Sequence, residues 1–237
     1  MTTTLKRPGG EMSHREMHFI WIIDCSGSMA ANGKIQSVNE GVKSSLAAMR
    51  EAAGENPEGR LLVRVVTFAD AAAWHVGLAT PVESFRWDDV AADGRTAMGE
   101  ALSLVADALH VDKMGGRGQR PILVLMSDGQ PTDDFGGGLK RLMAQPWGQK
   151  AVRLAFAIGD DADQECLGKF VGTSEVPVIK VENAAQLKAY IRWVSSVVVR
   201  SVSSPASRPD SAGLSNEPLI PLPPPPPPGS DVTGQQF

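Results

Sequence analysis

The sequence predicts an α/β fold: a doubly wound, mostly parallel sheet with helices on both faces and one antiparallel edge strand. Short apolar runs typical of strands alternate with longer stretches in which apolar residues recur at helical spacing. The run at 121–127 (PILVLMS) is apolar on both faces, as a central strand of a parallel sheet should be. Alternation of this kind is typical of sheets covered by helices on both sides.

The expected elements follow one another between residues 18 and 199. Strands are expected at 18–24, 61–69, 72–78, 121–127, 152–158 and 176–181. The strand at 72–78 is expected to pair with 61–69 as a hairpin, which supplies the antiparallel edge. Helices are expected at 34–53, 96–109, 135–144, 163–170 and 184–199. The first of these helices places Val38, Val42 and Leu46 on one face.

A chain of 237 residues with 42% hydrophobic residues suits one domain of about 200 residues with an appended segment. After about residue 201 the composition becomes rich in Ser, Pro and Gly, with six consecutive prolines at 223–228. We expect a flexible N-terminus at 1–14, a domain at 15–200, and a disordered tail at 201–237 whose proline run is extended. Two roles are open for that run, a passive tail or a ligand for a proline-binding groove.

Net charge and cysteine content narrow the class of protein. The formal net charge is −4, which disfavours nucleic acid or an anionic membrane as a partner. The two cysteines form no CxxC pair and no disulfide framework, which favours a reducing compartment. No apolar stretch follows Lys6 and Arg7, and the apolar run at 193–199 is far shorter than the ~20 residues that span a bilayer. A cytoplasmic location is therefore expected.

Three oxygen-bearing motifs follow predicted strands or open a predicted helix. The first, Asp24-Cys25-Ser26-Gly27-Ser28, follows the first strand. Two hydroxyls two residues apart can converge on one point, and Gly27 is expected to permit the turn. Mg²⁺ prefers oxygen ligands in octahedral geometry and usually keeps some of its water. Asp24 is expected to accept hydrogen bonds from that water.

The other two motifs are Gly94-Arg95-Thr96 and Ser127-Asp128-Gly129. Doubly wound sheets bind ligands outside the carboxyl ends of their strands, where the strand order reverses. Each residue alone has a commoner structural interpretation, such as a helix N-cap for Thr96 or a turn cap for Asp128. The joint pattern favours a divalent metal site, for Mg²⁺ with Mn²⁺ as the alternative.

The three motifs together resemble the metal-ion-dependent adhesion site (MIDAS) of von Willebrand factor A (vWA) domains, which have a Rossmann-like fold. The five matching positions occur in order and are Asp24, Ser26, Ser28, Thr96 and Asp128. The resemblance spans residues 15–200. It implies that the three hydroxyls ligate the metal directly and that the two carboxylates hold its water. It also implies that a protein partner's Asp or Glu fills the sixth position.

The surrounding words DCSGSM, DGRTAMGEAL and SDGQPTDD are most similar to the bacterial TerY-like branch, named for its association with tellurium resistance. Members of that branch work beside a protein kinase and a PP2C-type phosphatase. The resemblance therefore implies a bacterial stress or phosphorylation-linked complex with those two partners.

Enzymatic alternatives fit the residues less well. A P-loop needs four residues between its glycines and a hydroxyl after its lysine, whereas five residues separate Gly27 from Gly33 and Ile35 follows Lys34. A haloacid-dehalogenase-type phosphatase would need an acid where Ser26 stands, and the glycines of a serine-hydrolase elbow are absent from both serines. A binding protein rather than an enzyme is expected. A metal-dependent nucleotide or phosphoester hydrolase is the alternative.

Four residues beside the motifs have two interpretations each. Cys25 is expected to be a small, half-buried residue rather than a reactive thiol. Asp133 and Asp134 are expected to form an acidic turn or cap a helix, with recognition of a basic partner residue as the alternative. Arg95 is expected to face solvent, with contact to a partner's phosphate or carboxylate as the alternative.

Overall fold

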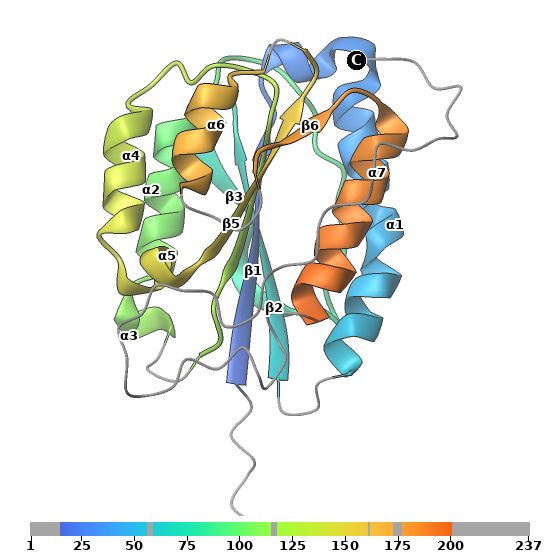
Figure 1. Ribbon diagram of the computed structural model, residues 1–237, viewed down its shortest axis with the longest axis vertical. Coiled ribbons are helices and arrows are strands. Elements are labelled where there is room, and N and C mark those ends of the chain that lie inside the picture. The colour runs from blue at the N-terminus through green and yellow to red at the C-terminus, as the bar shows by residue number, and fades with distance from the viewer. Residues whose placement is uncertain (1–14, 56–58, 115–117, 161, 173–176, 201–237) are drawn as a thin grey trace, which may run out of the picture.

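A six-stranded sheet with the order β3-β2-β1-β4-β5-β6 runs through the middle of the molecule (Figure 1). The computed structural model describes residues 15–55, 59–114, 118–160, 162–172 and 177–200, so the predicted N-terminus 1–14 and tail 201–237 lie outside the described residues. The strands are β1 (Arg15–Asp24), β2 (Gly59–Phe68), β3 (Ala72–Pro81), β4 (Ile122–Ser127), β5 (Val152–Ile158) and β6 (Ile179–Val181). Only β2 and β3 pair antiparallel among these described strands, which confirms the predicted fold class and hairpin.

Helices cover both faces of the sheet (Figure 1). One layer holds α1 (Lys34–Gly54), α7 (Ala184–Trp193) and the π-helical turn η2 (Val194–Val198). The other layer holds α2 (Met98–Ala108), α3 (Val111–Met114), α4 (Phe135–Met143), α5 (Pro146–Lys150) and α6 (Gln164–Val171). A 3₁₀ segment, η1 (Gly27–Gly33), joins β1 to α1. Within the described ranges, no helix is both long and apolar enough to cross a bilayer.

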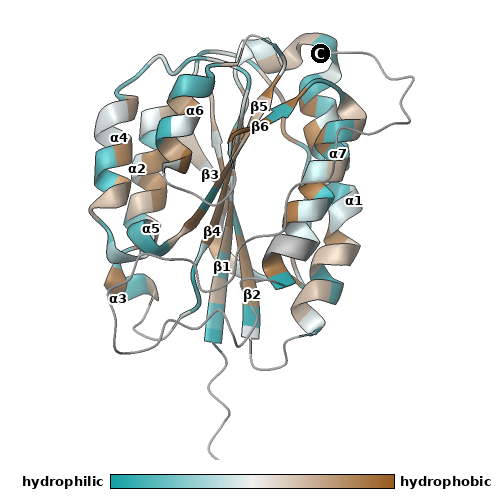
Figure 2. Cartoon of the chain, viewed as in Figure 1, coloured by the Kyte–Doolittle hydropathy of each residue, from teal (hydrophilic) through white to brown (hydrophobic). Residues whose placement is uncertain are grey.

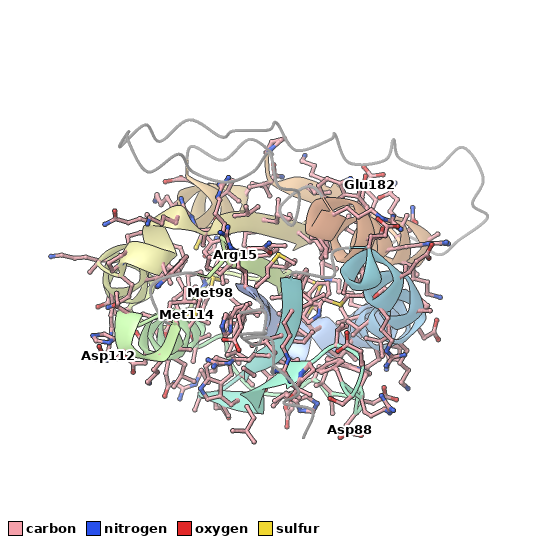
Figure 3. All side chains as sticks on the ribbon, turned by 90° about the horizontal axis from the view of Figure 1, so that it is seen from below. Arg15, Asp88, Met98, Asp112, Met114 and Glu182 are labelled. Atoms are coloured by element: carbon pink, nitrogen blue, oxygen red, sulfur yellow. The ribbon has the colours of Figure 1, made fainter. Side chains whose placement is uncertain are left out.

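The end-on view of Figure 3 shows how the second layer is oriented. Met98 of α2 and Met114 of α3 are buried and lie on the inner side of their helices, whereas the exposed Asp112 lies at the periphery. Figure 2 shows the same segregation by hydropathy, with brown strands in the centre and teal on the outer helix surfaces. The helical spacing of apolar residues in the sequence therefore corresponds to one buried face per helix.

The core consists of two clusters separated by the sheet, because alternate residues of a strand point to opposite faces. Phe19, Trp21 and Ile23 of β1 belong to the cluster beneath α1 and α7, whereas Ile20 and Ile22 belong to the cluster beneath α2. All five are completely buried. This double burial is why the sequence of β1 is almost continuously apolar.

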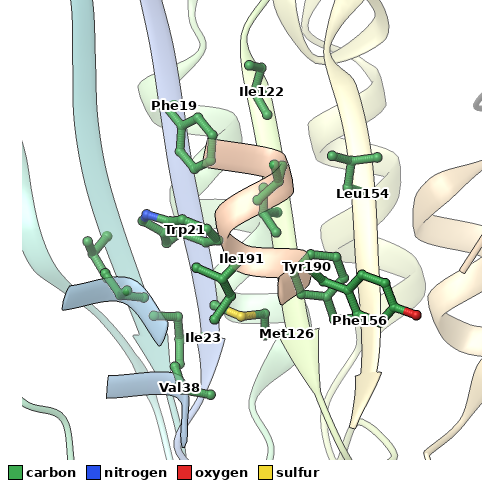
Figure 4. Packing of buried hydrophobic residues seen from close by; sticks show 14 of the residues in the cluster. Phe19, Trp21, Ile23, Val38, Ile122, Met126, Leu154, Phe156, Tyr190 and Ile191 are labelled. Carbon is green, nitrogen blue, oxygen red and sulfur yellow. The ribbon is translucent and has the colours of Figure 1, made fainter. Parts of the chain in front are cut away.

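Helix α7 closes the first cluster (Figure 4). Tyr190 and Ile191 lie over the sheet beside Met126 and Phe156. The rings of Tyr190 and Phe156 have centroids 6.0 Å apart. The helix expected at 184–199 is regular to Trp193 and then continues as the π-helical turn, a local change of pitch that apolar spacing does not predict.

The strand order places the ends of β1 and β4 side by side. From β1 the chain continues to β2 and β3 on one side of the sheet, and then crosses to β4 on the other side of β1. Ile23 pairs with Met126, so Asp24 and Ser127 end their strands next to each other. This is the point where the strand order reverses and where doubly wound sheets place ligands.

Candidate metal centre

Asp24 is the last residue of β1, and its side chain is completely buried. Its Oδ1 accepts a hydrogen bond from the backbone N–H of Ser26 at 2.8 Å, and its Oδ2 accepts one from the Ser127 hydroxyl at 2.5 Å. Burial raises the pKa of Asp24, and the hydrogen bonds from Ser127 and Ser26 oppose that rise. Donors on both oxygens fix the orientation of this carboxylate.

The two serine hydroxyls lie next to each other and next to Asp128. The Oγ atoms of Ser26 and Ser28 are 3.0 Å apart, and the Ser28 hydroxyl donates to Asp128 Oδ1 at 2.7 Å. Asp128 follows β4 directly and is almost fully buried. The expected role of Gly27 is wrong: its φ is not positive, and a Cβ there would meet the nearest atom, the Gly94 carbonyl oxygen, at an ordinary 3.5 Å. The chain turns through the 3₁₀ segment η1, which starts at Gly27, and the Met29 N–H donates to the Ser26 carbonyl at 3.0 Å.

Thr96 joins these residues from the loop that precedes α2. Its backbone N–H donates to the Thr132 hydroxyl at 3.1 Å, and its carbonyl accepts from the Thr132 N–H at 2.9 Å. A Cβ placed on Gly129 would lie 3.7 Å from Thr96 Oγ1 and 3.8 Å from Ser28 Oγ, so both hydroxyls approach Gly129. The structure thus brings together all five residues that the sequence singled out. Thr96 lies before α2 rather than inside it, since that helix begins at Met98.

The loop after β4 is tied to the start of α2 by Asp133. Its carboxylate accepts from the N–H groups of Gly99 and Glu100 at 2.9 and 2.8 Å. Asp134 caps α4 by accepting from the Gly137 N–H at 2.8 Å. The interpretation of this acidic pair as helix caps is therefore confirmed. Asp133 helps to set where Thr96 lies, a role that the sequence did not reveal because the contact joins two distant segments.

The loop that carries Thr96 is also held by Asn39 of α1, a buried residue that the sequence interpretation missed. Its side-chain amide donates to the Val90 carbonyl at 2.9 Å, and its oxygen accepts from the Val90 N–H at 3.0 Å and from Trp87 Nε1 at 3.1 Å. These three bonds replace secondary structure in the long connection between β3 and α2. The feature of the sequence that could have revealed this role is a polar residue on the inner face of a predicted helix.

At the tip of the same loop, Gly94 has a left-handed φ of 83°, and a Cβ there would lie 2.9 Å from Asp70 Cγ. Glycine is required at this position for both reasons. Arg95 projects into solvent with 75% of its side chain exposed, and its Nε lies 3.3 Å from Asp70 Oδ1. The solvent-facing interpretation of Arg95 is confirmed.

Lys34 is a charged residue of the centre that the sequence interpretation missed. Its Nζ lies 2.7 Å from Asp128 Oδ2, and the two side chains are 5% and 0% exposed. Lys34 begins α1 and precedes Val38 by four residues and Val42 by eight, which places it in phase with the apolar stripe. This phase could have revealed the buried lysine from the sequence, because a lysine on an apolar stripe points inward and needs a partner there.

Cys25 is a buried structural residue. Its backbone N–H donates to the Phe68 carbonyl, and its carbonyl accepts from the Asp93 N–H, each at 2.8 Å. Burial, followed by the charge of Asp24, raises the pKa of the Cys25 thiol to about 12. A thiol with so little thiolate is a poor nucleophile, as the sequence led us to expect.

The donor set fits a hard divalent cation. The described residues contain no cluster of three or more His, Cys, Asp or Glu side chains that could hold a metal ion, so hydroxyls would have to supply ligands here. Adjacent ligands of an octahedral Mg²⁺, each at about 2.1 Å, lie about 3.0 Å apart. The Oγ atoms of Ser26 and Ser28 have that separation. All-oxygen donors favour Mg²⁺ or Mn²⁺ over softer ions that prefer nitrogen and sulfur.

A model of the von Willebrand factor type A domain family matches residues 20–192. The chain belongs to this family. Comparison with curated protein sequences finds no significant match. The vWA assignment agrees with the fold and with the arrangement of hydroxyls and carboxylates at the ends of β1 and β4.

Solved structures share the vWA fold. A von Willebrand factor type A protein from Catenulispora acidiphila has a TM-score of 0.61 and 18% identity over 79% of this chain and 43% of its own. Proximal thread matrix protein 1 from the mussel byssus, with zinc in its MIDAS motif, has a TM-score of 0.57 and 16% identity over 80% and 48%. The pilus adhesin SpaC from Lactobacillus rhamnosus GG has a TM-score of 0.60 and 15% identity over 79% and 31%. This chain therefore spans less than half the length of each.

Proposed function

We propose that this vWA domain is a metal-dependent protein-binding module and that a partner's Asp or Glu completes its metal centre. In this proposal Mg²⁺, with Mn²⁺ as the alternative, is ligated directly by Ser26, Ser28 and Thr96. Asp24 and Asp128 hold its water molecules and offset its charge. The observation that carries the proposal is the 3.0 Å separation of the Ser26 and Ser28 hydroxyls between two buried carboxylates.

The family and the neighbouring structures support this role. vWA domains mediate protein–protein interaction, and those with a MIDAS bind divalent metals. The mussel protein holds zinc in this motif, and SpaC is a pilus adhesin. A catalytic role would need a nucleophile activated by a base. Within the described residues, the hydroxyls of Ser26 and Ser28 are hydrogen-bonded to each other and to Asp128, and no histidine, the commonest general base, accepts from either of them. We therefore favour binding over hydrolysis of nucleotides or phosphoesters.

The finer placement in the TerY-like branch rests on three sequence words, DCSGSM, DGRTAMGEAL and SDGQPTDD. On that basis we propose a protein kinase and a PP2C-type phosphatase as partners, in a bacterial stress or phosphorylation-linked complex. The proposed domain extends over residues 15–200. A cytoplasmic location stays a prediction from the cysteine usage.

Calorimetric titration with Mg²⁺, Mn²⁺ and Ca²⁺ tests the metal centre, using the wild type and Asp24→Ala. The expected result is binding by the wild type and its loss in the variant. Asp107→Ala is a matched control, because Asp107 is an exposed acid on α2 that pairs with Arg141. Equal metal binding by wild type and Asp24→Ala would remove the basis of the proposal.

Partner capture from a bacterial lysate, with and without EDTA, tests the binding role. Proteins that bind through the metal should be released by EDTA and should not bind Asp24→Ala. Retention of every partner in EDTA would contradict metal-dependent association. Incubation with ATP and p-nitrophenyl phosphate in Mg²⁺ tests the alternative, and turnover that Asp24→Ala abolishes would establish a hydrolase.

A further inference from the structure

We propose that Lys34 sets the selectivity of the metal centre by weakening metal binding and strengthening the binding of a partner's carboxylate. The inference rests on the proposed function, since it concerns the same five residues. It assigns the centre a sixth functional residue, a fixed cation contributed by α1.

The position of Lys34 places its charge inside the centre. Its Nζ lies 2.7 Å from Asp128 Oδ2, while the other oxygen of Asp128 accepts from the Ser28 hydroxyl at 2.7 Å. The Lys34 side chain is 5% exposed and that of Asp128 is 0% exposed. The exposed pair of Arg95 and Asp70, in contrast, is open to screening by water and salt. The charge of Lys34 acts in a medium of lower effective dielectric constant, where it is felt more strongly.

A charge count gives the consequence. Asp24 and Asp128 contribute two negative charges, which would balance a divalent cation and leave the loaded centre neutral. With the ammonium of Lys34 included, the metal-free centre carries −1 and the loaded centre carries +1. The change from −2 to −1 lowers the attraction of the metal-free centre for the metal. The change from 0 to +1 raises the attraction of the loaded centre for an incoming carboxylate. A carboxylate from the partner would bring the whole centre to neutrality.

The backbone at the start of α1 directs the Lys34 side chain into the interior of the domain. Asn32 and Gly33 both have left-handed backbone, with φ of 53° and 73°, at the turn from η1 into α1. The helix then places Lys34 on the stripe of Val38 and Val42. Replacing a buried ion pair by well-packed apolar residues is often neutral or stabilising, so stability alone does not account for a lysine at this position. A role in the charge of the centre does account for it.

The substitution Lys34→Met tests the proposal, because methionine has a similar length and no charge. Mn²⁺ affinity is measured by calorimetry on the whole chain. Acetate, the simplest carboxylate, is then titrated into the Mn²⁺-loaded protein while the water-proton relaxation rate is followed, since displacement of metal-bound water lowers that rate. The variant is expected to bind Mn²⁺ at least about tenfold more tightly and acetate at least about tenfold more weakly than the wild type.

Opposite changes in the two affinities separate this role from a structural one, which would weaken both together. Lys34→Arg retains the charge and is expected to keep more of the acetate affinity than Lys34→Met. Lys43→Met is the matched control: Lys43 lies on the same helix, but its side chain is 49% exposed and pairs with Asp89. Both of its affinities should stay within about twofold of the wild type. Lys34→Gln repeats the test if methionine prevents folding.

The outcomes distinguish the two proposals. If the wild type binds no Mn²⁺, the proposed metal centre fails and this inference fails with it. If the wild type binds Mn²⁺ and acetate and Lys34→Met leaves both affinities unchanged or lowers both, the role of Lys34 alone is overturned.

Discussion

Ser127 and Asp24 end neighbouring strands of the sheet, and the Ser127 hydroxyl donates to Asp24 Oδ2 at 2.5 Å. Both side chains are completely buried, so bulk solvent does not compete for this bond. The bond links the two central strands at the edge where the hydroxyls of the candidate metal centre converge.

Loss of that bond should lower stability. Ser127→Ala leaves a buried carboxylate oxygen without its closest donor, which should reduce the free energy of unfolding by about 1–3 kcal/mol. Ser44→Ala is a matched control, because Ser44 is exposed on α1 and its hydroxyl donates only to the carbonyl of Gly41 in the same helix. That change should stay within about 0.5 kcal/mol. Urea unfolding measures both, and equal values would contradict the importance of the Asp24 bond.

The close crossing of α2 and α4 predicts different effects for two glycines of α4. A Cβ on Gly138 would lie 2.1 Å from the Gly99 carbonyl oxygen, whereas one on Gly136 would meet its nearest neighbour, Asp134 Oδ1, at 3.8 Å. Gly138→Ala should therefore cost about 1–3 kcal/mol by forcing the helices apart. It should also weaken Mn²⁺ binding, because Thr96 lies just before α2.

Gly136→Ala should be neutral or stabilising by up to about 1 kcal/mol, since alanine is a better helix former than glycine. Thermal unfolding and Mn²⁺ calorimetry on the two variants check both parts. Equal stability of the two variants would show that the helices can separate at no cost.

Much of the fold could be predicted because it depends on local patterns. The strand at 152–158 has the predicted bounds, and the first helix begins at the predicted residue. The segments η1, α3 and α5 were missed, since four to seven residues are too few to show a period. Of the predicted strand at 176–181, residue 176 lies outside the described residues, and β6 begins at Ile179, so the predicted start was too early.

The residues of the candidate site could be predicted from the sequence, but the hydrogen bonds that hold them in place could not. Asp24 ends a strand, Asp128 follows one and Thr96 precedes a helix, and parallel topology brings such positions together. The bond from Ser127 to Asp24 spans 103 positions in the chain, and the bond from Gly99 to Asp133 spans 34. No local pattern specifies contacts of this kind, because they depend on the tertiary arrangement of loops that are distant in the chain.

His18 makes stability depend on pH in the acidic range. It is buried on β1, neither ring nitrogen has a hydrogen-bond partner, and Glu16 Oε2 lies 3.9 Å away. Burial, followed by the positive charge of Arg64, lowers its pKa from 6.5 to about 4. Between these values the unfolded chain binds more protons than the folded one, so stability falls as the pH falls from 6.5 to 4.

The full loss from His18 amounts to about 3 kcal/mol. Urea unfolding at several pH values measures it, and His18→Leu should flatten the dependence in this window. An unchanged slope in His18→Leu would show that other groups cause the acid sensitivity.

The two cysteines should be unreactive in the native protein. Cys25 and Cys166 are each 6% exposed, and burial is the first cause that raises their pKa values, to about 12 and about 11. Iodoacetamide at pH 8 should label neither residue until urea is added. Mass spectrometry of the labelled peptides checks this, and rapid native labelling of Cys25 would show that the loop after β1 opens.

Anomalous diffraction from crystals grown in Mn²⁺ and acetate would locate the metal ion and identify its ligands. We expect one ion at the ends of β1 and β4, about 2.1–2.3 Å from the hydroxyl oxygens of Ser26, Ser28 and Thr96. Asp24 and Asp128 should contact it through water, and acetate should occupy the remaining position. An ion bound elsewhere, or held by the two carboxylates without the hydroxyls, would overturn the proposed metal centre.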